Sequence, residues 1–367
     1  MASFRFFVRF LRWHMGHTLP MIMHHSSTYP ELPRKSAFRR YLDNIYIYIR
    51  DGAPCAAYDA FGLDIKGACL NDYISNHRWL GFLYWKLSEV GLESKTAYAK
   101  LLFDGDSPVH LLTDKFCFWS FLDRHNIPVV PVLAHTIGGK LYDYTPKDKP
   151  LASMSRIFIK PSNGSCGKSC CVLSLKDGHF FSGDQPADLN DFIGQSQDYI
   201  FQPVIENHAD IKALNPNTLN TLRIVTCRTG DGKYELWNPG MLRIGRSHGV
   251  VDNFAQGGIG VGIDEKGRLK RYGYTHDKQL NYFKLERHPD TKELFEGKVL
   301  PYYQEAVSLV LDAHKLFPKL QTIGWDVAVT PEGPVLVEGN QSWDIEMLQV
   351  VHHEGFVPRF REIYGDL

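Results

Sequence analysis

The amino-acid sequence predicts an α+β protein with a largely helical accessory region at its N-terminal end. After Pro150, short runs rich in β-branched and aromatic residues alternate with turn residues, which is typical of antiparallel hairpins. Residues 301–317 begin with proline and carry an apolar stripe, which predicts a helix among the strands. Residues 30–100 instead show helical patterns separated by loops, among them residues 76–90.

The predicted strands are residues 156–160, 169–175, 199–205, 221–227, 234–244, 324–330 and 335–338. Before them, Thr113 or Asp114 is placed to cap an amphipathic helix over residues 112–124, and the chain is expected to enter a strand within residues 125–131. We therefore divide the chain into an accessory region, 1–110, a first α+β unit, 111–205, and a second, 206–367.

The composition excludes several classes of protein. With 44% hydrophobic and 22% charged residues, the 367-residue chain is expected to fold into a globular structure. Lys plus Arg and Asp plus Glu number 41 each, so no net charge attracts a polyanion and we expect no nucleic-acid partner. The seven cysteines lack the paired spacing of a structural zinc site, which indicates reduced thiols in the cytoplasm.

The first 13 residues, MASFRFFVRFLRW, place three arginines on one face of a helix and apolar side chains on the other. One interpretation is a helix that packs on the protein, and the other is a peripheral contact with the inner face of the membrane. The arginines interrupt the apolar run too often for a signal peptide, and no later stretch reaches the roughly 20 apolar residues that a spanning helix needs.

Two acids and an asparagine lie on the last two predicted strands. Glu338 and Asn340 share one strand face, and Asp326 joins them only if the connection between the strands has an odd number of residues. A three-residue loop with Gly333 in the left-handed conformation would meet that condition. Two carboxylates and an amide oxygen form a hard-oxygen site of the kind that Mg²⁺ uses beside nucleotide phosphates. The alternative is that the acids lie on the solvent face of an edge hairpin.

A small-residue loop follows Lys160, which ends an apolar predicted strand. The loop contains Gly164, Ser165, Cys166 and Gly167. Backbone N–H groups of such a loop can approach phosphate oxygens closely. It is not a P-loop, because the leading glycine of that motif is replaced by serine and a strand, not a helix, is predicted to follow. We expect the loop to fold over phosphates as a lid, the alternative being an ordinary hairpin turn.

Three further segments carry candidate binding residues. Gln202, Pro203 and Val204 follow an apolar run, and their backbone is a candidate to meet the edge of a purine. Arg223 lies in a predicted strand, where its planar guanidinium fits a phosphate or carboxylate, the alternative being a surface salt bridge. Asn253 opens a glycine-bearing loop suited to close backbone approach.

Taken in order over residues 112–348, these motifs resemble the ATP-grasp superfamily, most closely its RimK-like glutamate ligases and the sugar-transfer-associated ATP-grasp proteins. The resemblance implies the ATP-grasp fold, in which two α+β subdomains clasp ATP. Lys115 and Lys160 are similar to the two lysines that contact the α- and β-phosphates in D-alanine–D-alanine ligases. Residues 202–204 would be the adenine hinge, with Glu206 or His208 near the ribose.

The same resemblance covers the metal and catalytic positions. Arg243 falls in the M-x-R run and Asn253 in the N-x-x-x-G-G run of RimK-like ligases. Asp326, Glu338 and Asn340 match the magnesium-binding D…E-x-N pattern, which implies ATP with two Mg²⁺ ions, or Mn²⁺ in their place.

The chain departs from the family pattern at two places. Many relatives carry arginine two residues before the metal aspartate or before the loop asparagine, where this chain has Gly324 and Val251. Arg223, Arg243 and Arg246 are the candidates to supply that charge. After Asn340 the chain has Gln-Ser-Trp-Asp in place of Ser-Pro-Gly, and because that segment often lines the acceptor site, the resemblance implies an unusual acceptor.

The activity that the resemblance implies is an ADP-forming ligase. A small-molecule carboxylate attacks the γ-phosphate of ATP to give an acyl phosphate, and an amine then displaces phosphate to leave an amide. An amino acid and a uronate or other cell-surface polysaccharide precursor are candidate substrates. The alternatives are a phosphotransferase of the same fold and a non-catalytic nucleotide-binding module of a polysaccharide assembly system. The oligomeric state stays open.

Overall fold

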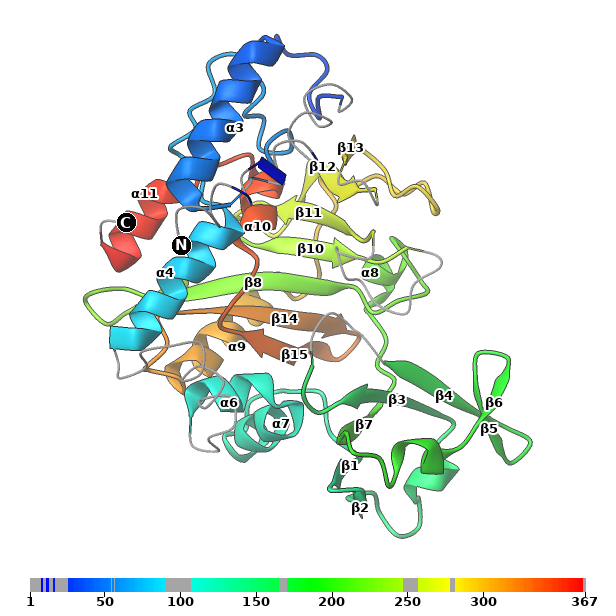
Figure 1. Ribbon diagram of the computed structural model, residues 1–367. Helices are drawn as coiled ribbons and strands as arrows, with labels where there is room; N and C mark the ends of the chain where they lie inside the picture. The colour runs from blue at the N-terminus through cyan, green and yellow to red at the C-terminus, as the bar shows by residue number, and fades with distance from the viewer. Residues whose placement is uncertain are drawn as a thin grey trace.

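The computed structural model describes residues 26–53, 55, 57–89, 107–164, 170–246, 257–277 and 281–365, together with Val8, residues 11–12 and Gly16. It has a helical N-terminal region at one end, an eight-stranded sheet in the middle and a seven-stranded sheet at the other end (Figure 1). The predictions for Ser165, Cys166, Gly167 and Asn253, and for most of residues 1–13, lie outside the described residues.

The N-terminal region contains α3 (Ala37–Asp51) and α4 (Asn76–Glu89), the second of which confirms the helix predicted there. α4 packs against the C-terminal helices α10 (Ile345–His352) and α11 (Val357–Tyr364). Trp79 of α4 donates a hydrogen bond from Nε1 to the Trp343 carbonyl at 3.1 Å. The two ends of the chain therefore share one hydrophobic core. Within the described ranges, no helix combines the length and apolar character needed to cross a bilayer.

The seven-stranded sheet is antiparallel throughout, in the order β2-β1-β7-β3-β4-β5-β6. Its strands are β1 (Ala134–Ile137), β2 (Lys140–Asp143), β3 (Arg156–Pro161), β4 (Cys171–Lys176), β5 (His179–Ser182), β6 (Gln185–Ala187) and β7 (Tyr199–Pro203). Short 3-10 helices span Leu151–Ser153 and Leu189–Phe192. Before the sheet come α6 (Pro108–Thr113) and α7 (Lys115–Arg124). Of the two predicted caps, Asp114 is the one that caps α7, its side chain accepting from the Cys117 N–H at 2.9 Å. The helix predicted over residues 112–124 begins at Lys115 instead, because the extended backbone of Asp114 separates it from α6.

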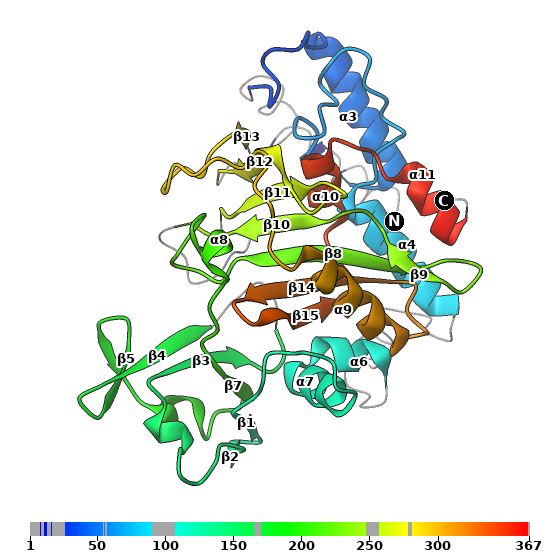
Figure 2. The same ribbon diagram turned by 180° about the vertical axis from the view of Figure 1, so that it is seen from behind.

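The eight-stranded sheet is also antiparallel, in the order β13-β12-β11-β10-β8-β14-β15, with β9 paired to β8. Its strands are β8 (Thr221–Arg228), β9 (Tyr234–Leu236), β10 (Met241–Ile244), β11 (Ile259–Ile263), β12 (Leu269–His276), β13 (Tyr282–Leu285), β14 (Thr322–Thr330) and β15 (Gly333–Asn340). The helices of this half are α8 (Ala209–Lys212) and α9 (Tyr303–Lys315). Figure 2 shows α9 against the face of β14 and β15 that is turned away from α4.

The predicted strands are confirmed as β3, β4, β7, β8, β14 and β15, and two expectations are wrong. Residues 234–244 do not form one strand, because the chain turns at Gly240 with φ 85° between β9 and β10. Residues 125–131 contain only an isolated bridge from Val129 to Leu336, and the first strand begins at Ala134. Pro128 and Pro131 lack the N–H groups that a strand ladder needs.

The hairpin of β14 and β15 differs from the predicted one. Thr330 pairs with Gly333, so the connection has two residues and the three-residue loop was wrong. A β-bulge restores the alignment: Val327 pairs with Leu336 but Asp326 pairs with Glu338, which leaves one extra residue on β15. Asp326 and Glu338 therefore do share a face, for a different reason. The subdomain boundaries at 110 and 205 stay predictions.

A close approach at Gly324 gives a prediction about stability. A methyl group added there would lie 2.5 Å from Trp343 Cβ, so Gly324→Ala should lower the free energy of unfolding by about 1–3 kcal/mol through overpacking. Gly230→Ala is the control, because a methyl group at Gly230 meets nothing within 4 Å. Chemical denaturation measures both, and an unchanged midpoint for Gly324→Ala would contradict the packing described.

Candidate functional site

A cleft of about 640 Å³ lies between the two sheets. One wall comes from β3, β4 and β7 of the seven-stranded sheet. The opposite wall comes from β8, β10, β14 and β15, and the start of α10 closes one end. Its size falls in the range of small-molecule pockets, and it brings together residues that are far apart in the sequence.

The wall from the seven-stranded sheet carries the predicted nucleotide residues. Lys160 ends β3 with only 4% of its surface exposed, and its Nζ lies 3.3 Å from Glu338 Oε1 across the cleft. Gln202 is buried on β7 and its Nε2 donates to the Val130 carbonyl at 3.1 Å. The cleft is also lined by Gly164, Pro203 and Val204. The Lys160 ammonium group and the backbone of Gly164, Pro203 and Val204 therefore line the same cleft.

Three other residues predicted to bind the nucleotide, Lys115, Glu206 and His208, make contacts with other groups of the protein. Lys115 is not among the cleft-lining residues, and its Nζ donates to the Gly164 carbonyl at 2.8 Å, which ties the start of α7 to the loop after β3. Burial lowers the pKa of Lys115, and the Glu338 carboxylate opposes that effect. Glu206 lines the cleft and pairs with Lys212 at 2.6 Å. His208 caps α8, its Nδ1 accepting from the Asp210 N–H at 3.3 Å, and is not a cleft residue.

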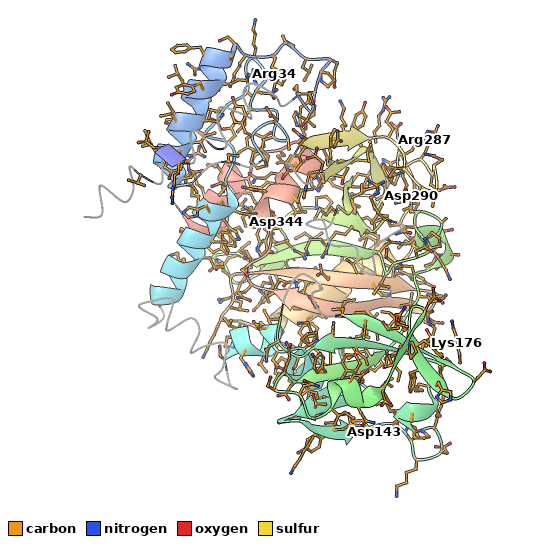
Figure 3. The ribbon with its side chains drawn as sticks, turned by 45° about the vertical axis from the view of Figure 1, so that its right-hand side comes forward. Arg34, Asp143, Lys176, Arg287, Asp290 and Asp344 are labelled. Carbon is orange, nitrogen blue, oxygen red and sulfur yellow. The ribbon has the colours of Figure 1, made fainter. Side chains whose placement is uncertain are left out.

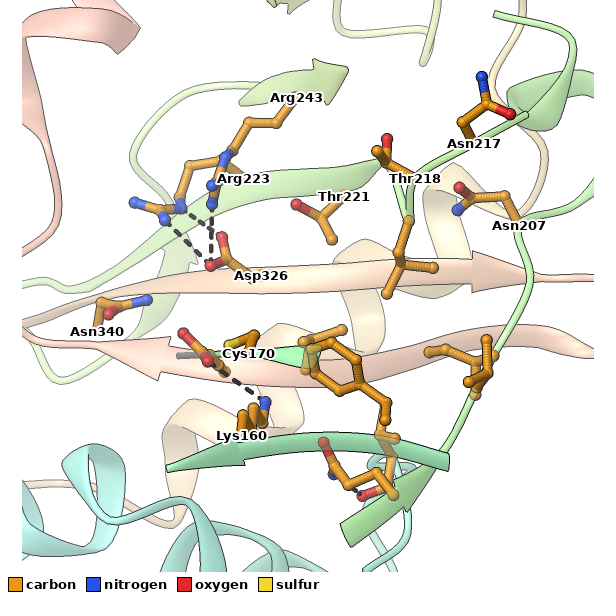
Figure 4. Close-up of a pocket in the computed structure, with 18 of the residues that line it drawn as sticks. Lys160, Cys170, Asn207, Asn217, Thr218, Thr221, Arg223, Arg243, Asp326 and Asn340 are labelled. Carbon is orange, nitrogen blue, oxygen red and sulfur yellow. Dashed lines mark hydrogen bonds and ion pairs between the residues drawn. The ribbon is translucent and has the colours of Figure 1, made fainter. Parts of the chain in front are cut away.

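Asp326 stands at the centre of a row of charges that crosses three neighbouring strands. On β14 it pairs with Arg223 of β8 on one side and with Glu338 of β15 on the other. Arg223 binds both carboxylate oxygens, with Nε to Oδ1 at 2.6 Å and Nη2 to Oδ2 at 3.1 Å. Arg243 of β10 adds Nη1 to Oδ2 at 3.0 Å (Figure 4). One carboxylate therefore holds two guanidinium groups in the cleft wall.

The electrostatics of this cluster favour anions. Burial by itself would raise the pKa of Asp326, but the two guanidinium groups outweigh burial and hold that pKa below its ordinary value. The side chains of Arg223 and Arg243 are only 11% and 13% exposed. With Lys160 opposite, the side chains named here amount to three positive charges against the two negative charges of Asp326 and Glu338. A phosphate or carboxylate entering this part of the cleft would meet net positive charge.

The structure explains why arginine is absent two residues before Asp326. The space in front of Gly324 is taken by the Trp343 side chain, whose Nε1 donates to Thr322 Oγ1 at 3.1 Å. An arginine side chain at position 324 would collide with that indole. Of the three candidates for the missing charge, Arg223 and Arg243 reach Asp326, whereas Arg246 lies 3.6 Å from Asp290.

The oxygen set proposed for a divalent cation was tested against this geometry. Asp326 and Glu338 are directly opposed, and Asn340 pairs with Gly324 two residues along the same hairpin face. A carboxylate has about four lone-pair sites, and the arginines occupy three of those of Asp326. The oxygens left for a cation are the remaining site on Asp326, the Glu338 carboxylate and the Asn340 amide, which are of the ligand type that a hard cation takes. Among the residues that the structure describes, no group of three or more His, Cys, Asp or Glu side chains is placed to hold a metal, so the set depends on Asn340.

The end of the cleft at α10 contains a functional candidate that the sequence analysis did not single out. Asp344 caps α10, its Oδ1 accepting from the Glu346 N–H and from Asn76 Nδ2, each at 2.9 Å. Glu346 lines the cleft, and its Oε1 accepts from the Asn76 N–H at 3.0 Å. Burial and then Asp344 raise the pKa of Glu346 to about 7. The only sequence signal was the unusual segment after Asn340, which ends at Asp344, two residues before Glu346.

Comparison with known proteins places these features in a family. A family model described as sugar-transfer associated ATP-grasp matches residues 94–364. No curated protein sequence matches the chain. Among solved structures, N5-carboxyaminoimidazole ribonucleotide synthetase from Thermotoga maritima is similar at 12% identity and a TM-score of 0.38, over 80% of this chain and 58% of that one.

Two further solved structures show a similarly low sequence identity to this chain. D-alanyl-alanine synthetase A from Vibrio cholerae shares 13% identity with a TM-score of 0.36, over 67% of this chain and 61% of that one. A RimK domain ATP-grasp protein from Sphaerobacter thermophilus shares 12% identity with a TM-score of 0.33, over 66% of this chain and 67% of that one. This chain spans less than two thirds of the first and second of these three structures.

Similarities this distant do not carry an activity from one protein to another. The family match is different, because it covers well over half of the chain and includes both sheets and the cleft between them. The chain belongs to the sugar-transfer associated ATP-grasp family and is an α+β protein with the ATP-grasp fold.

Proposed function

We propose that the protein is an ADP-forming ligase that uses ATP to join a small-molecule carboxylate to an amine. The observation that carries this proposal is the cleft, in which Lys160, Arg223 and Arg243 face the opposed carboxylates of Asp326 and Glu338. Phosphoryl transfer needs positive charge around the transferred group and oxygen ligands for the accompanying cation. This cleft offers both on rigid strands.

The proposed nucleotide position follows from the wall of the seven-stranded sheet. The base would lie against the backbone of residues 203–204, close to the buried Gln202. The phosphates would extend toward Lys160 and Gly164, where the ammonium group neutralises their charge. Lys115 would act on the same phosphates indirectly. Its hydrogen bond to the Gly164 carbonyl would hold the start of the loop that follows β3 in position. Glu206 is the residue placed to meet the ribose.

Asp326, Glu338 and Asn340 would hold Mg²⁺, which supplies neutralisation of the charge that develops on the transferred phosphoryl group. The protein's own contribution is to hold these oxygens on two paired strands, so that little reorganisation is needed when the ion arrives. Glu338 is also bonded to Lys160, so its carboxylate links the nucleotide wall to the metal oxygens.

Arg223 and Arg243 are placed to hold the carboxylate substrate. Each guanidinium has five N–H donors in a fixed plane, and Asp326 takes only two of those of Arg223. The carboxylate oxygen would attack the γ-phosphorus, and ADP would leave with the electron pair of the broken P–O bond. An acyl phosphate formed there would stay within reach of the guanidinium groups, which match its oxygens.

The amine would enter from the α10 end, beside Asp344 and Glu346. When its nitrogen attacks the acyl carbon, the C–O bond breaks, phosphate leaves with that electron pair, and the nitrogen loses a proton. Glu346, with a pKa of about 7, is suited to accept that proton near neutral pH. A phosphotransferase would need a hydroxyl in place of the amine at the same position, so the acceptor decides between the two activities.

The deciding experiment is a screen of the purified protein for ADP release with panels of carboxylates and amines, uronates and amino acids included. A ligase requires ADP release that depends on both substrates, together with an amide product identified by mass spectrometry. A phosphorylated hydroxyl product would favour the phosphotransferase. Binding of ATP without release of ADP against every panel would favour a non-catalytic module.

The two metal-site acids should differ when each is neutralised. Glu338→Gln should abolish Mg²⁺-dependent ADP release and lower the unfolding free energy by about 1–2 kcal/mol, because its carboxylate is about a third exposed but pairs with the buried Lys160 ammonium group. Asp326→Asn should abolish the same activity and also cost about 3 kcal/mol of stability, because it removes the charge that holds two buried guanidinium groups.

ADP release and chemical denaturation of each variant measure these two effects separately. Wild-type activity in Glu338→Gln would contradict its role as a metal ligand. Equal stability of the two variants would contradict the central place of Asp326 among the arginines.

Protonation of Glu346 should appear in the pH dependence of stability. Its folded-state pKa of about 7 lies above the ordinary value of 4.5, so the folded state binds the proton more tightly than the unfolded state. The wild-type free energy of unfolding should therefore fall, relative to that of Glu346→Gln, as the pH rises from 4.5 to about 7, and the difference should then stay constant. Asp344 and Asp51 raise this pKa and the Asn76 N–H lowers it.

Denaturation of wild type and variant across that pH range measures the difference. Glu305→Gln, which removes the same charge from an exposed site on α9, controls for the change in net charge. Parallel stability curves for wild type and Glu346→Gln would show that the carboxyl titrates alike in both states, and would remove the basis for its role as a base.

A further inference from the structure

Helix α3 turns its apolar face to the solvent. Phe38, Leu42, Tyr46 and Ile49 recur at spacings of four, four and three residues, and their exposed fractions are 71%, 41%, 44% and 67%. Between them lie the half-buried Tyr41 and Ile45, which complete a continuous band along the helix. We call these six residues the α3 stripe. An amphipathic helix of a globular protein normally points such a band at the core.

The side of α3 that the protein buries carries four polar residues together with Ile47 and Tyr48, each 1% exposed. Asp43 is 2% exposed and bonds Lys35 at 2.8 Å and the Tyr58 hydroxyl at 3.0 Å. Asp51 is 6% exposed and accepts from Ser75 Oγ at 2.8 Å. Arg40 and Asn44 are buried on the same side. Polar contacts and the burial of Ile47 in the hydrophobic core hold the helix in place, while the α3 stripe faces outward, with the Tyr46 hydroxyl donating to Asn71 Oδ1 at 2.8 Å.

The stripe is separate from the cleft. None of its six residues lines the cleft. Figure 3 shows α3 at the end of the molecule where Arg34 lies, with Asp143 at the opposite end and Asp344 between them. A flat partner could therefore cover the stripe while the cleft stays accessible.

The sequence before α3 is basic. Residues 1–25 contain Arg5, Arg9 and Arg12 and no aspartate or glutamate, although the whole chain has no net charge. Val8 and Leu11, the two apolar residues described in that segment, are 38% and 43% exposed. An outward apolar band, in a chain that also carries an acid-free, arginine-bearing segment earlier in its sequence, is the combination that attracts an amphipathic helix to an anionic lipid surface.

A second copy of the chain fits less well. Stable interfaces between proteins need about 20–30 residues on each side, whereas the stripe offers six. A bilayer needs no such area, because aromatic and aliphatic side chains enter the interface one by one and Tyr and Phe are suited to that depth.

We propose that the α3 stripe is a membrane-contact surface that places the protein on a bilayer containing anionic lipids. The stripe would lie in the interfacial region with the helix parallel to the membrane. This proposal does not rest on the proposed ligase activity, and it adds a described surface to the contact expected from residues 1–13.

The test is co-sedimentation of the full-length chain with vesicles of phosphatidylcholine alone and of phosphatidylcholine mixed with phosphatidylglycerol. We expect binding to the mixed vesicles that weakens with added salt. The Phe38→Gln/Ile49→Gln double variant should lower the partition coefficient at least about tenfold, because two exposed apolar side chains no longer enter the bilayer. Glutamine keeps good helix propensity, so α3 should persist.

Val299→Gln is the matched control, since Val299 is 61% exposed and lies outside the stripe. Its binding should equal that of the wild type. Leu42→Gln provides a second variant, with a loss of several-fold, and thermal unfolding checks that each variant is folded.

Absence of binding to the mixed vesicles, equal binding to both vesicle types, or unchanged binding of the double variant would each overturn the proposal. A concentration-dependent dimer seen by light scattering, and lost in the double variant, would assign the stripe to a second copy instead.

Discussion

The charges in the cleft depend on one carboxylate. Asp326 sits on a strand with neighbours on both sides, so Arg223 reaches it from β8 and Glu338 faces it from β15, and Arg243 arrives from the next strand beyond. Two buried guanidinium groups without this partner would be costly, and so would a buried aspartate without them. The pairing of the strands sets the distances between these charged side chains, and the ion pairs in turn stabilise that pairing.

A second constraint connects this site to the N-terminal region. Trp343 fills the space in front of Gly324, contacts Trp79 through its backbone carbonyl, and lies in the segment that leads to Asp344 and α10. The indole thus explains the absence of an arginine at position 324, and the charge is instead supplied from β8 and β10. It also means that the accessory helices take part in shaping the end of the cleft where we place the amine.

Much of the second sheet could be predicted, because β8, β14 and β15 carry long apolar runs bounded by clear turns. The strands that were missed, such as β5 and β13, are short and partly exposed, so their sequences lack a strong period. The hairpin of β14 and β15 shows why counting residues along the chain was not enough to predict which side chains share a face. Its turn was one residue shorter than predicted, and the bulge next to the Asp326–Glu338 pair brought the two side chains back to one face. A bulge follows from packing and twist, which a single strand sequence does not encode.

By itself the sequence determined the family resemblance, the lysine at the end of β3 and the acid, acid and amide set, because these depend on residue identity and on short spacings along the chain. Tertiary structure alone decided which arginines reach Asp326 and that Glu346 lines the cleft. It also decided that Lys115 donates a hydrogen bond to the Gly164 carbonyl and that His208 caps α8. It also decided that α3 exposes a band of apolar side chains, since a helical period shows that a helix has two faces but not how much of each face the protein buries.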